Sequence, residues 1–454
     1  MRSNKSPITS TSKAVLAIFT VIMMGTSAWA SGQENVLYNF QGGNDGGYPI
    51  AGVVFDAKGN LYGTTDIGGG GGCIGGCGTV FKLTPTKNGG FTKKTIFTFQ
   101  GGPSDGQNPQ GRLVLDKHSN LYGTTTGGGS TLTAEGTVFK LTPTKNGEWK
   151  ETILHNFECL TSNDGCEPYS YLIFDRAGNL YGTTSIGGGG DNTEVCTNGC
   201  GTVFELSPGK NGKWSERLLH TFPKQFTSAG AVLYAGLVMD TRGYLYGTTY
   251  YGGEGGVVFR LTPSTHGLWE ETVLHSFSDN GTDGYAPYAG VVLDKSGNLY
   301  GATTRGGNSS LPSGIVFMLT ATRKGEWTET VIHDFPSTRY VDGDLPYTGV
   351  VEGAAGNLYG AAFLGGGQNE ADCSDNDGCG IIYELSPSSN GTWSETILYA
   401  FQAAPMEVFL WTMCLRWIRK GTSTAREGPG DRVAPAPELC LLSSRNRCKR
   451  VVVG

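Results

Sequence analysis

Short apolar runs separated by turn residues fill most of the chain. Residues 290–335 show the pattern best, as the runs GVVLD, NLYGATT, GIVFMLT and WTETVIHDF. Each run has five to nine residues and is rich in β-branched and aromatic side chains, and Gly, Pro, Asn and Asp stand between the runs. Runs of this length between turn residues are typical of β-strands. The pattern predicts a meander of four antiparallel strands in this stretch.

The same four runs recur six times. The string Asn-Leu-Tyr-Gly or a near variant marks each copy, with its tyrosine at Tyr62, Tyr122, Tyr181, Tyr246, Tyr300 and Tyr359. Fixed periods of this length indicate a repeat architecture. Four-stranded meanders with apolar residues on both faces cannot bury those faces alone, but they can when packed radially. We therefore predict an all-β fold, a β-propeller of four-stranded antiparallel blades. A flat solenoid is the competing architecture.

Turn residues support the meander independently of the apolar runs. Between the first and second strands, residues 56–59, 175–178, 240–243 and 294–297 all read Asp-x-x-Gly. An aspartate in the first turn position accepts backbone N–H bonds, and glycine in the fourth takes a positive φ without a Cβ clash. We interpret these aspartates as turn caps rather than as catalysts.

One strand-like segment stands before the first complete repeat. Residues 36–40 (VLYNF) resemble the fourth strand of a later repeat, residues 153–157 (ILHNF). A propeller ring can be closed by an outer strand taken from the other end of the chain. We predict six complete blades plus this orphan strand.

The first thirty residues have the pattern of a signal peptide. Arg2, Lys5 and Lys13 precede an apolar run over 14–25, and Ala28-Trp29-Ala30 forms a small-x-small cleavage site. Twelve apolar residues span about 18 Å as a helix, which is short for a membrane core of about 30 Å. We expect a signal peptide at 1–30, a propeller domain at 31–402 and no membrane span in the mature chain. An uncleaved anchor is the alternative.

The last fifty residues depart from the repeat pattern. After Phe401-Gln402, Met, Trp, Arg and Cys replace Gly, Thr and Asn. Loss of one nucleotide after the Gln402 codon would explain this, because the shifted frame can encode FQGG-x-DGGFPVDDVLAMDSEGNLYGT, which parallels residues 40–64. We hypothesise that 403–454 is an out-of-frame tail and that the restored chain has seven blades. A genuine basic tail is the alternative.

Composition narrows the class of partner. The 454 residues include 73 glycines without a three-residue period, which excludes collagen. With 34 basic and 40 acidic residues, the chain lacks the excess of positive charge that is typical of nucleic-acid-binding proteins. We expect a monomer whose partner is a polysaccharide or a protein.

Eight of the eleven cysteines fall into four close pairs. Local disulfides are the default for such pairs in loops of an exported chain, and zinc or redox chemistry is the weaker alternative. The three other cysteines lie in the tail. The expected pairs are Cys73 with Cys77, Cys159 with Cys166, Cys196 with Cys200, and Cys373 with Cys379.

A binding site is expected on the face that carries the long, variable loops. In a meander, the loops between strands two and three share one face with the connections from strand four to the next strand one. Irregular loops on a rigid scaffold are where binding usually resides. Candidate residues there are five aspartates, each followed by Gly, and three residues that break the repeat: Asp45, Asp105, Asp164, Asp283, Asp342, Tyr250, Tyr251 and Arg305.

Each candidate also has a simpler structural explanation. The aspartates could hold a hard cation such as Ca²⁺, but each could equally bond its own loop backbone, and the D-x-D-x-D-G spacing of calcium loops is missing. Tyr250, Tyr251 and Arg305 could bind a sugar or an anion, or they could be ordinary sequence variation at the surface. Four histidines in register share their slot with Tyr38, Phe97 and Tyr399, so we interpret them as blade packing rather than as metal ligands or catalytic bases: His155, His220, His275 and His333.

The repeats resemble a known family. The units GVVFDAKGNLYGTTDIGG (52–69), GVVLDKSGNLYGATTRGG (290–307) and GTVFKLTP (78–85) are similar to the GloVer tandem repeat of exported bacterial proteins, over residues 35 to 402. The resemblance implies propeller-like repeats followed by varied sorting segments, a choice-of-anchor arrangement. It implies no established activity and no catalytic residues.

Together these observations favour a secreted or cell-surface repeat protein that acts as a non-catalytic binding module. We expect no cofactor and no catalytic residue, and Ca²⁺ is the one ion considered. The alternative function is a propeller enzyme acting on glycans, a hydrolase or lyase. Hydrolysis would need two carboxylates roughly 5 to 9.5 Å apart in a cleft.

Overall fold

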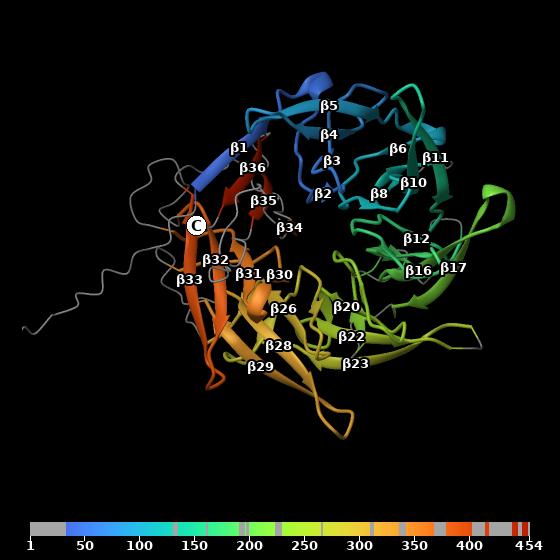
Figure 1. The fold of residues 1–454 in the computed structure, drawn as a ribbon. Helices are drawn as coiled ribbons and strands as arrows, with labels where there is room; N and C mark the ends of the chain where they lie inside the picture. The colour runs from blue at the N-terminus through green and yellow to red at the C-terminus, as the bar shows by residue number, and fades with distance from the viewer. Residues whose placement is uncertain are drawn as a thin grey trace, which may run out of the picture.

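Seven four-stranded sheets surround a central axis in the computed structural model (Figure 1). The structure describes residues 33–129, 135–159, 162–189, 196, 199–222, 229–264, 267–308, 313–335, 342–366, 378–401, 414–416, 438–443 and 447–452. The expected signal peptide lies outside them. Within this part of the chain there is no α-helix, and so no helix with the length and hydropathy of a membrane span.

The first three repeats form blades 1 to 3, each an antiparallel sheet in chain order. Blade 1 consists of β2 (Val54–Phe55), β3 (Leu61–Thr65), β4 (Thr79–Pro85) and β5 (Phe91–Thr98). Blade 2 consists of β7 (Val114–Leu115), β8 (Leu121–Thr125), β10 (Thr137–Pro143) and β11 (Trp149–Asn156). Blade 3 consists of β13 (Ile173–Phe174), β14 (Leu180–Thr184), β16 (Thr202–Pro208) and β17 (Trp214–Thr221).

The next three repeats form blades 4 to 6 in the same way. Blade 4 consists of β19 (Val238–Met239), β20 (Leu245–Thr249), β22 (Val257–Thr262) and β23 (Glu270–Ser276). Blade 5 consists of β25 (Val292–Leu293), β26 (Leu299–Thr303), β28 (Ile315–Ala321) and β29 (Trp327–Asp334). Blade 6 consists of β30 (Val350–Glu352), β31 (Leu358–Ala362), β32 (Ile381–Pro387) and β33 (Trp393–Ala400).

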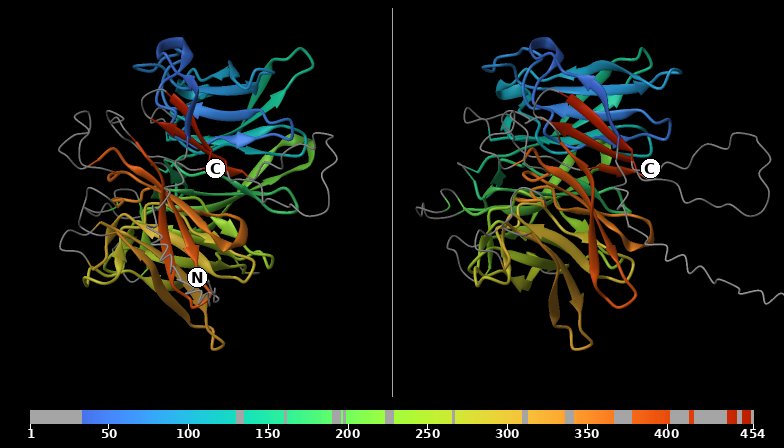
Figure 2. Two further views of the ribbon diagram at one scale, coloured as in Figure 1. Left: turned by 60° about the vertical axis from the view of Figure 1, so that its left-hand side comes forward. Right: turned by 90° about the vertical axis from the view of Figure 1, so that its left-hand side faces the viewer.

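The seventh sheet joins the two ends of the described chain. Its order is β1 (Gln33–Asn39), β36 (Arg447–Val452), β35 (Glu438–Ser443) and β34 (Cys414–Arg416). β1 pairs antiparallel with β36, and Figures 1 and 2 show the blue and red strands side by side between blades 6 and 1. This arrangement confirms the prediction that the orphan strand closes the ring, and it excludes an open solenoid.

Short elements on the loop face complete the described structure. Four two-stranded sheets link the Asp-Gly segments, or Ala229-Gly230 in the fourth repeat, to the loops that follow the second strands: β6 (Gly106–Gln107) with β9 (Gly127–Gly128), β12 (Gly165–Cys166) with β15 (Ile186–Gly187), β18 (Gly230–Ala231) with β21 (Tyr251–Gly252), and β24 (Gly284–Tyr285) with β27 (Arg305–Gly306). Single 3-10 turns are η1 (Gly43–Asp45), η2 (Gly102–Ser104), η3 (Lys210–Gly212) and η4 (Ala354–Gly356).

The glycine of each Asn-Leu-Tyr-Gly string is required by close packing inside the blade. A Cβ added at Gly182 would stand 2.5 Å from Cζ of Phe204, and Gly63 and Gly301 meet Phe81 and Phe317 in the same way. Each of these phenylalanines is fully buried. The second strand therefore lies against an aromatic ring of the third strand, which leaves no room for a side chain at this glycine.

The tyrosine of the string points to the opposite face and helps to join neighbouring blades. The Tyr62 ring lies 5.9 Å from that of Trp149, and Tyr122 and Trp214 repeat this contact one blade later. The Tyr62 hydroxyl donates to Oδ2 of Asp56 at 3.2 Å, and Oδ1 of Asp56 accepts the Asn60 backbone N–H at 2.9 Å. These bonds confirm that the Asp-x-x-Gly aspartates cap turns.

Candidate functional site

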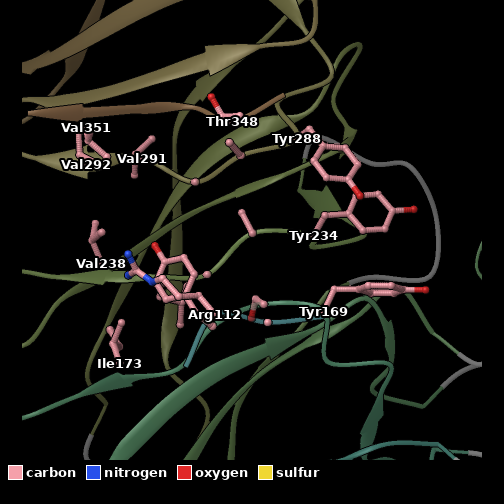
Figure 3. A pocket seen from close by; sticks show the side chains of 18 of the residues that line it. Arg112, Tyr169, Ile173, Tyr234, Val238, Tyr288, Val291, Val292, Thr348 and Val351 are labelled. Atoms are coloured by element: carbon pink, nitrogen blue, oxygen red, sulfur yellow. The ribbon is translucent and has the colours of Figure 1, made fainter. Parts of the chain in front are cut away.

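A cavity of about 600 Å³ occupies the central channel of the ring. Its walls are the innermost strands β13, β19, β25 and β30 and the segments that lead into them, with Ile50 and 110–112 from blades 1 and 2. The volume falls in the usual range for small-molecule sites. Figure 3 shows apolar side chains such as Val238 and Val291 along the channel, and tyrosines at one end.

Four tyrosines in register form an arc at the mouth of this cavity. They occupy one repeat position, three or four residues before the innermost strand, in blades 3 to 6: Tyr169, Tyr234, Tyr288 and Tyr347. Tyr234 and Tyr288 stack with ring centroids 4.8 Å apart. Tyr169 meets Tyr234 edge-on at 5.8 Å, and Tyr347 meets Tyr288 at 5.6 Å. Adjacent blades thus build one continuous aromatic surface.

Backbone geometry fixes where this arc lies. Two residues before each arc position the chain takes a left-handed conformation, and Val232, which precedes Tyr234, has φ 58°. The Val232 N–H donates to the Cys200 carbonyl of blade 3 at 2.8 Å, and its own carbonyl accepts the Tyr250 N–H at 2.9 Å. Such strained positions persist only where the surroundings enforce them. The same conformation recurs in all six repeats, at Tyr48, Asn108, Glu167, Val232, Ala286 and Leu345.

The hydroxyls of three arc residues, Tyr169, Tyr234 and Tyr288, stay protonated at neutral pH. Burial, with a smaller contribution from Glu167, raises the pKa of Tyr169 to about 12. Burial and the neighbouring tyrosines also raise the pKa of Tyr234 and Tyr288. Protonated phenols can both donate and accept hydrogen bonds. In Figure 3 the hydroxyls of Tyr169 and Tyr234 point away from Arg112.

Deeper in the channel, Arg112 is the one charged side chain among the described residues of the cavity lining. Its guanidinium carbon lies 4.7 Å from the centre of the Tyr171 ring, a cation–π contact. Burial raises the pKa of Tyr171, although Arg112 opposes the shift. Within the described chain Arg112 forms no ion pair with a carboxylate. Its charge therefore makes the cavity favourable to an anion.

Three residues expected from the sequence lie beside the arc. The Tyr250 ring is 5.6 Å from Tyr234 and 4.6 Å from Tyr251, and 45% of Tyr251 is exposed. The positive charge of Arg305 acts on the Tyr250 hydroxyl, so Arg305 lies near the same cluster. None of these three belongs to the cavity lining itself.

The five candidate aspartates lie apart from one another, one at each of five junctions between blades. No potential metal-ligand group among the described residues contains two of them. Each does bond its own loop, as Asp105 does by accepting the Gly106 and Gln100 N–H groups. Each also faces the outer strands of two adjacent blades. Asp45, for example, accepts a bond from the Tyr38 hydroxyl at 2.9 Å and pairs with Lys93 at 2.6 Å.

Histidines and glutamates complete most of these junctions. His155 of β11 lies 2.9 Å from Asp164, and Glu216 of β17 belongs to the same group. His275 with Asp283 and Glu329, and His333 with Asp342 and Glu395, repeat this arrangement. We name these three groups the junction triads. In the shared slot, Phe97 and His155 pair with equivalent valines of the third strand, which confirms that these positions are in register.

A β-bulge in every outer strand determines which face of the blade the junction side chains lie on. In β11 the register shifts between His155, opposite Val138, and Ile153, opposite Phe139. The shift places His155 and Glu151 on opposite faces of the sheet, although an unbroken strand would put residues four apart on one face. Glu151 consequently faces blade 1, and His155 faces blade 3.

Crowding of the carboxyl groups alters their ionisation. Burial and the nearby Asp105 raise the pKa of Glu151 to about 9, and burial with Asp342 has the same effect on Glu395. Burial and Asp164 raise the pKa of Glu216 to about 7. In contrast, Lys93 and backbone bonds lower the pKa of Asp45 despite its burial.

Sequence reasoning missed the arc, the channel arginine and the junction glutamates. The arc tyrosines follow proline in blades 3, 5 and 6, and Arg112 and Tyr171 fill a slot that holds glycine in the other four repeats. A glutamate stands four residues before each histidine, in the pattern Trp-x-Glu-x-x-x-His. Aligning the six copies position by position would have revealed all of these features.

The disulfides agree with the expected pairing. Bonds join Cys73 to Cys77, Cys159 to Cys166, and Cys196 to Cys200. Cys379 is also disulfide-bonded, and its expected partner Cys373 lies outside the described residues.

The fold and the cavity define a β-propeller repeat protein with an aromatic central channel. The model of the Gloeobacter/Verrucomicrobia repeat matches residues 22–196 and 190–409, so the chain belongs to this repeat family. Curated proteins give no match to the chain. A solved structure that it resembles is the periplasmic gluconolactonase PpgL of Pseudomonas aeruginosa, with 13% identity, a TM-score of 0.45, and coverage of 78% of this chain and 86% of that one.

Proposed function

We propose that this protein is an exported, non-catalytic binding module that takes a polysaccharide at the tyrosine arc. The observation that carries the proposal is the arc itself, four tyrosines in register around the mouth of the central cavity. Aromatic rings offer flat apolar surfaces to the C–H faces of sugar rings, and phenol hydroxyls bond their oxygens. The outer tyrosines, Tyr250 and Tyr251, extend this surface beyond the cavity.

The cavity favours an acidic saccharide over a basic ligand. Arg112 supplies a positive charge at the inner end, and no Asp, Glu or His belongs to the described lining. A guanidinium pairs well with a carboxylate or a sulfate group. Glycan hydrolysis, the alternative function, needs a pair of carboxylates flanking the scissile bond. The described lining has none, which is why we propose binding rather than hydrolysis.

Export to the cell surface is part of the proposal. The charged and apolar segment at 1–30 has the order of a signal peptide, and three local disulfides suit an oxidising compartment. Sorting to the surface by a C-terminal segment would follow the choice-of-anchor arrangement of similar repeats. Mass spectrometry of the exported protein tests this, with Ser31 expected as the first residue of the mature chain.

We further propose that residues 403–454 derive from a frame change. The strands β34, β35 and β36 stand where a seventh repeat would lie, with β1 as its outer strand, which supports seven blades in the restored chain. The nucleotide sequence tests the hypothesis directly. Codons that cannot yield Gly-Asn-Leu-Tyr-Gly-Thr in the shifted frame would end it.

Binding at the arc is tested with a glycan array followed by calorimetry on the tightest acidic oligosaccharide. Tyr288→Gln removes the ring but uses a residue that the chain already carries in this slot, Gln110. We expect affinity to fall roughly tenfold, about 1.4 kcal/mol. Tyr288→Phe keeps the ring and should retain most of the affinity.

The matched control changes a tyrosine that lies in a turn rather than at the arc. Tyr244 follows the turn at 240–243, where all five other repeats hold asparagine, so Tyr244→Asn should fold. Its affinity should equal that of the wild type. Equal affinity of the wild type and Tyr288→Gln would overturn the proposed site.

A further inference from the structure

The junction triads combine one imidazole and two carboxylates from three separate segments. In each triad the histidine lies on the outer strand of one blade, the aspartate lies in the Asp-Gly segment that follows it, and the glutamate lies on the outer strand of the next blade. The ligand atoms of each triad all lie within 4.8 Å of one another. The triads are His155 with Asp164 and Glu216, His275 with Asp283 and Glu329, and His333 with Asp342 and Glu395.

Hydrogen bonds do not account for the spacing in the triad of His333. His333 Nε2 is 3.9 Å from Asp342 and 3.8 Å from Glu395, and it has no hydrogen-bond partner although it is buried. His275 Nε2 makes long hydrogen bonds of 3.3 and 3.4 Å to the Asp283 carboxylate and lies 3.6 Å from Glu329. Two ligands of a tetrahedral Zn²⁺, each about 2.1 Å from the ion, stand roughly 3.4 Å apart. The triads of His275 and His333 therefore have about the spacing of ligands around an ion, while His155 Nε2 forms a 2.9 Å hydrogen bond with Asp164.

Buried carboxylate oxygens without partners lie in the same place. Oε1 atoms of Glu216, Glu329 and Glu395, one from each triad, are buried and accept no hydrogen bond. Such atoms carry a desolvation penalty unless a cation or a proton compensates them. Glu151 and Glu271, at two junctions outside the triads, have the same unsatisfied Oε1 atom, so the triads differ from those junctions in combining such an oxygen with both a histidine and an aspartate.

The first junction shows what satisfies an aspartate of this kind. There Lys93 holds the register position of the glutamate, opposite Leu83 as Glu151 is opposite Leu141. The Lys93 ammonium lies 2.6 Å from the Asp45 carboxylate, and only 4% of its side chain is exposed. A cation built into the chain thus neutralises the junction where the glutamate is absent.

We propose that each of the three junction triads binds one Zn²⁺ ion, which joins adjacent blades. Imidazole and carboxylate together suit zinc, whereas Ca²⁺ prefers a shell of six to eight oxygens. Three protein ligands leave one tetrahedral position for water. Two other junctions lack a ligand, since Phe97 replaces the histidine in one and Ala229 replaces the aspartate in the other. The inference is independent of any ligand in the central channel.

The test counts zinc bound by the metal-stripped full chain, after free thiols have been blocked with iodoacetamide. We expect three ions per chain by mass spectrometry of the dialysed protein and a rise in Tm on adding ZnCl₂. His333→Phe copies Phe97 and should reduce the count to two. Phe97→His completes a triad with Asp105 and Glu151 and should raise the count to four.

His220→Phe is the matched control, because His220 pairs with Glu271 at 3.3 Å but has no aspartate in its junction. The count should stay at three. Glu395→Lys imitates Lys93 and should remove one ion while keeping the fold, which circular dichroism checks. A count near zero, an equal loss from His220→Phe and His333→Phe, or no gain from Phe97→His would overturn the proposal.

Discussion

At the residue scale, the role of a single position can be inferred by comparing the residues at the equivalent position of the six repeats. The glycine of the Asn-Leu-Tyr-Gly string is kept because a ring of the third strand occupies its Cβ position. The histidine slot accepts Phe and Tyr, so the fold needs only an aromatic ring there. The same comparison shows which positions break the pattern, and Arg112 and Tyr171 are the clearest of these.

Gly182→Ala should destabilise blade 3. The new Cβ would lie 2.5 Å from Cζ of Phe204, and this ring is fully buried and cannot move aside. Overpacking of this kind costs about 1–3 kcal/mol in the free energy of unfolding. Urea denaturation measures the change. Gly90→Ala is the control, because its nearest neighbour would be 3.6 Å away and its φ is not positive, and it should leave the midpoint almost unchanged.

Glu151 should make stability depend on pH. Burial and Asp105 raise its pKa from 4.5 in the unfolded chain to about 9 in the folded one. A raised pKa means that the folded state binds the proton more tightly than the unfolded state. The protonated Glu151 therefore adds to the free energy of unfolding in full below about pH 4.5, and this stabilisation is lost as the pH rises toward 9. Glu151→Gln, which stays neutral, should therefore gain stability over the wild type at pH 8.5 but not at pH 4.5.

Thermal unfolding across this pH range measures the effect. Glu148→Gln is the control on the same hairpin, since 76% of the Glu148 side chain is exposed. Parallel stability profiles of the wild type and Glu151→Gln would show that Glu151 is not buried as a protonated acid.

At the element scale, the number and order of the strands could be predicted from the sequence, but the length of the strands and the orientation of their side chains could not. The four runs of each repeat are the four strands of each blade. The innermost strands have only two or three residues, and a left-handed residue stands five or six positions before each of them. The bulge in every outer strand could not be expected either, since one unpaired residue leaves no mark on the apolar pattern. Without the bulge, the side chains that form the junctions could not be assigned to blades.

The Cys196–Cys200 bond should hold the loop that supports the arc. The Cys200 carbonyl accepts the Val232 N–H two residues before Tyr234. Closing so short a loop contributes about 2 kcal/mol in the chain-entropy model. We expect the Cys196→Ser, Cys200→Ser variant to unfold at lower temperature and to exchange the Val232 amide faster.

Hydrogen exchange resolved by mass spectrometry gives the second readout. The matched variant, Cys73→Ser with Cys77→Ser, should show faster exchange at Asn108, whose N–H bonds the Cys77 carbonyl, and no change at Val232. Unchanged exchange at Val232 in the first variant would contradict this supporting role.

At the scale of the whole molecule, the periodic pattern was enough to predict the ring, because radial packing buries both faces of every blade. The orphan strand 36–40 indicated how the ring closes, and β1 does close the seventh sheet. The candidate site was harder to predict. The face of the ring that carries the site was inferred from loop lengths. The arc and Arg112 could not be predicted, because they depend on which strand lies nearest the ring axis, and no local sequence pattern encodes the distance of a strand from that axis.

Saccharide binding at the arc of the channel can be seen directly in a crystal structure of the chain with the tightest acidic oligosaccharide from the array. We expect sugar density in van der Waals contact with Tyr234 and Tyr288, with the acidic group turned toward Arg112. Density confined to the outer edges of the blades, with none at the channel mouth, would contradict it.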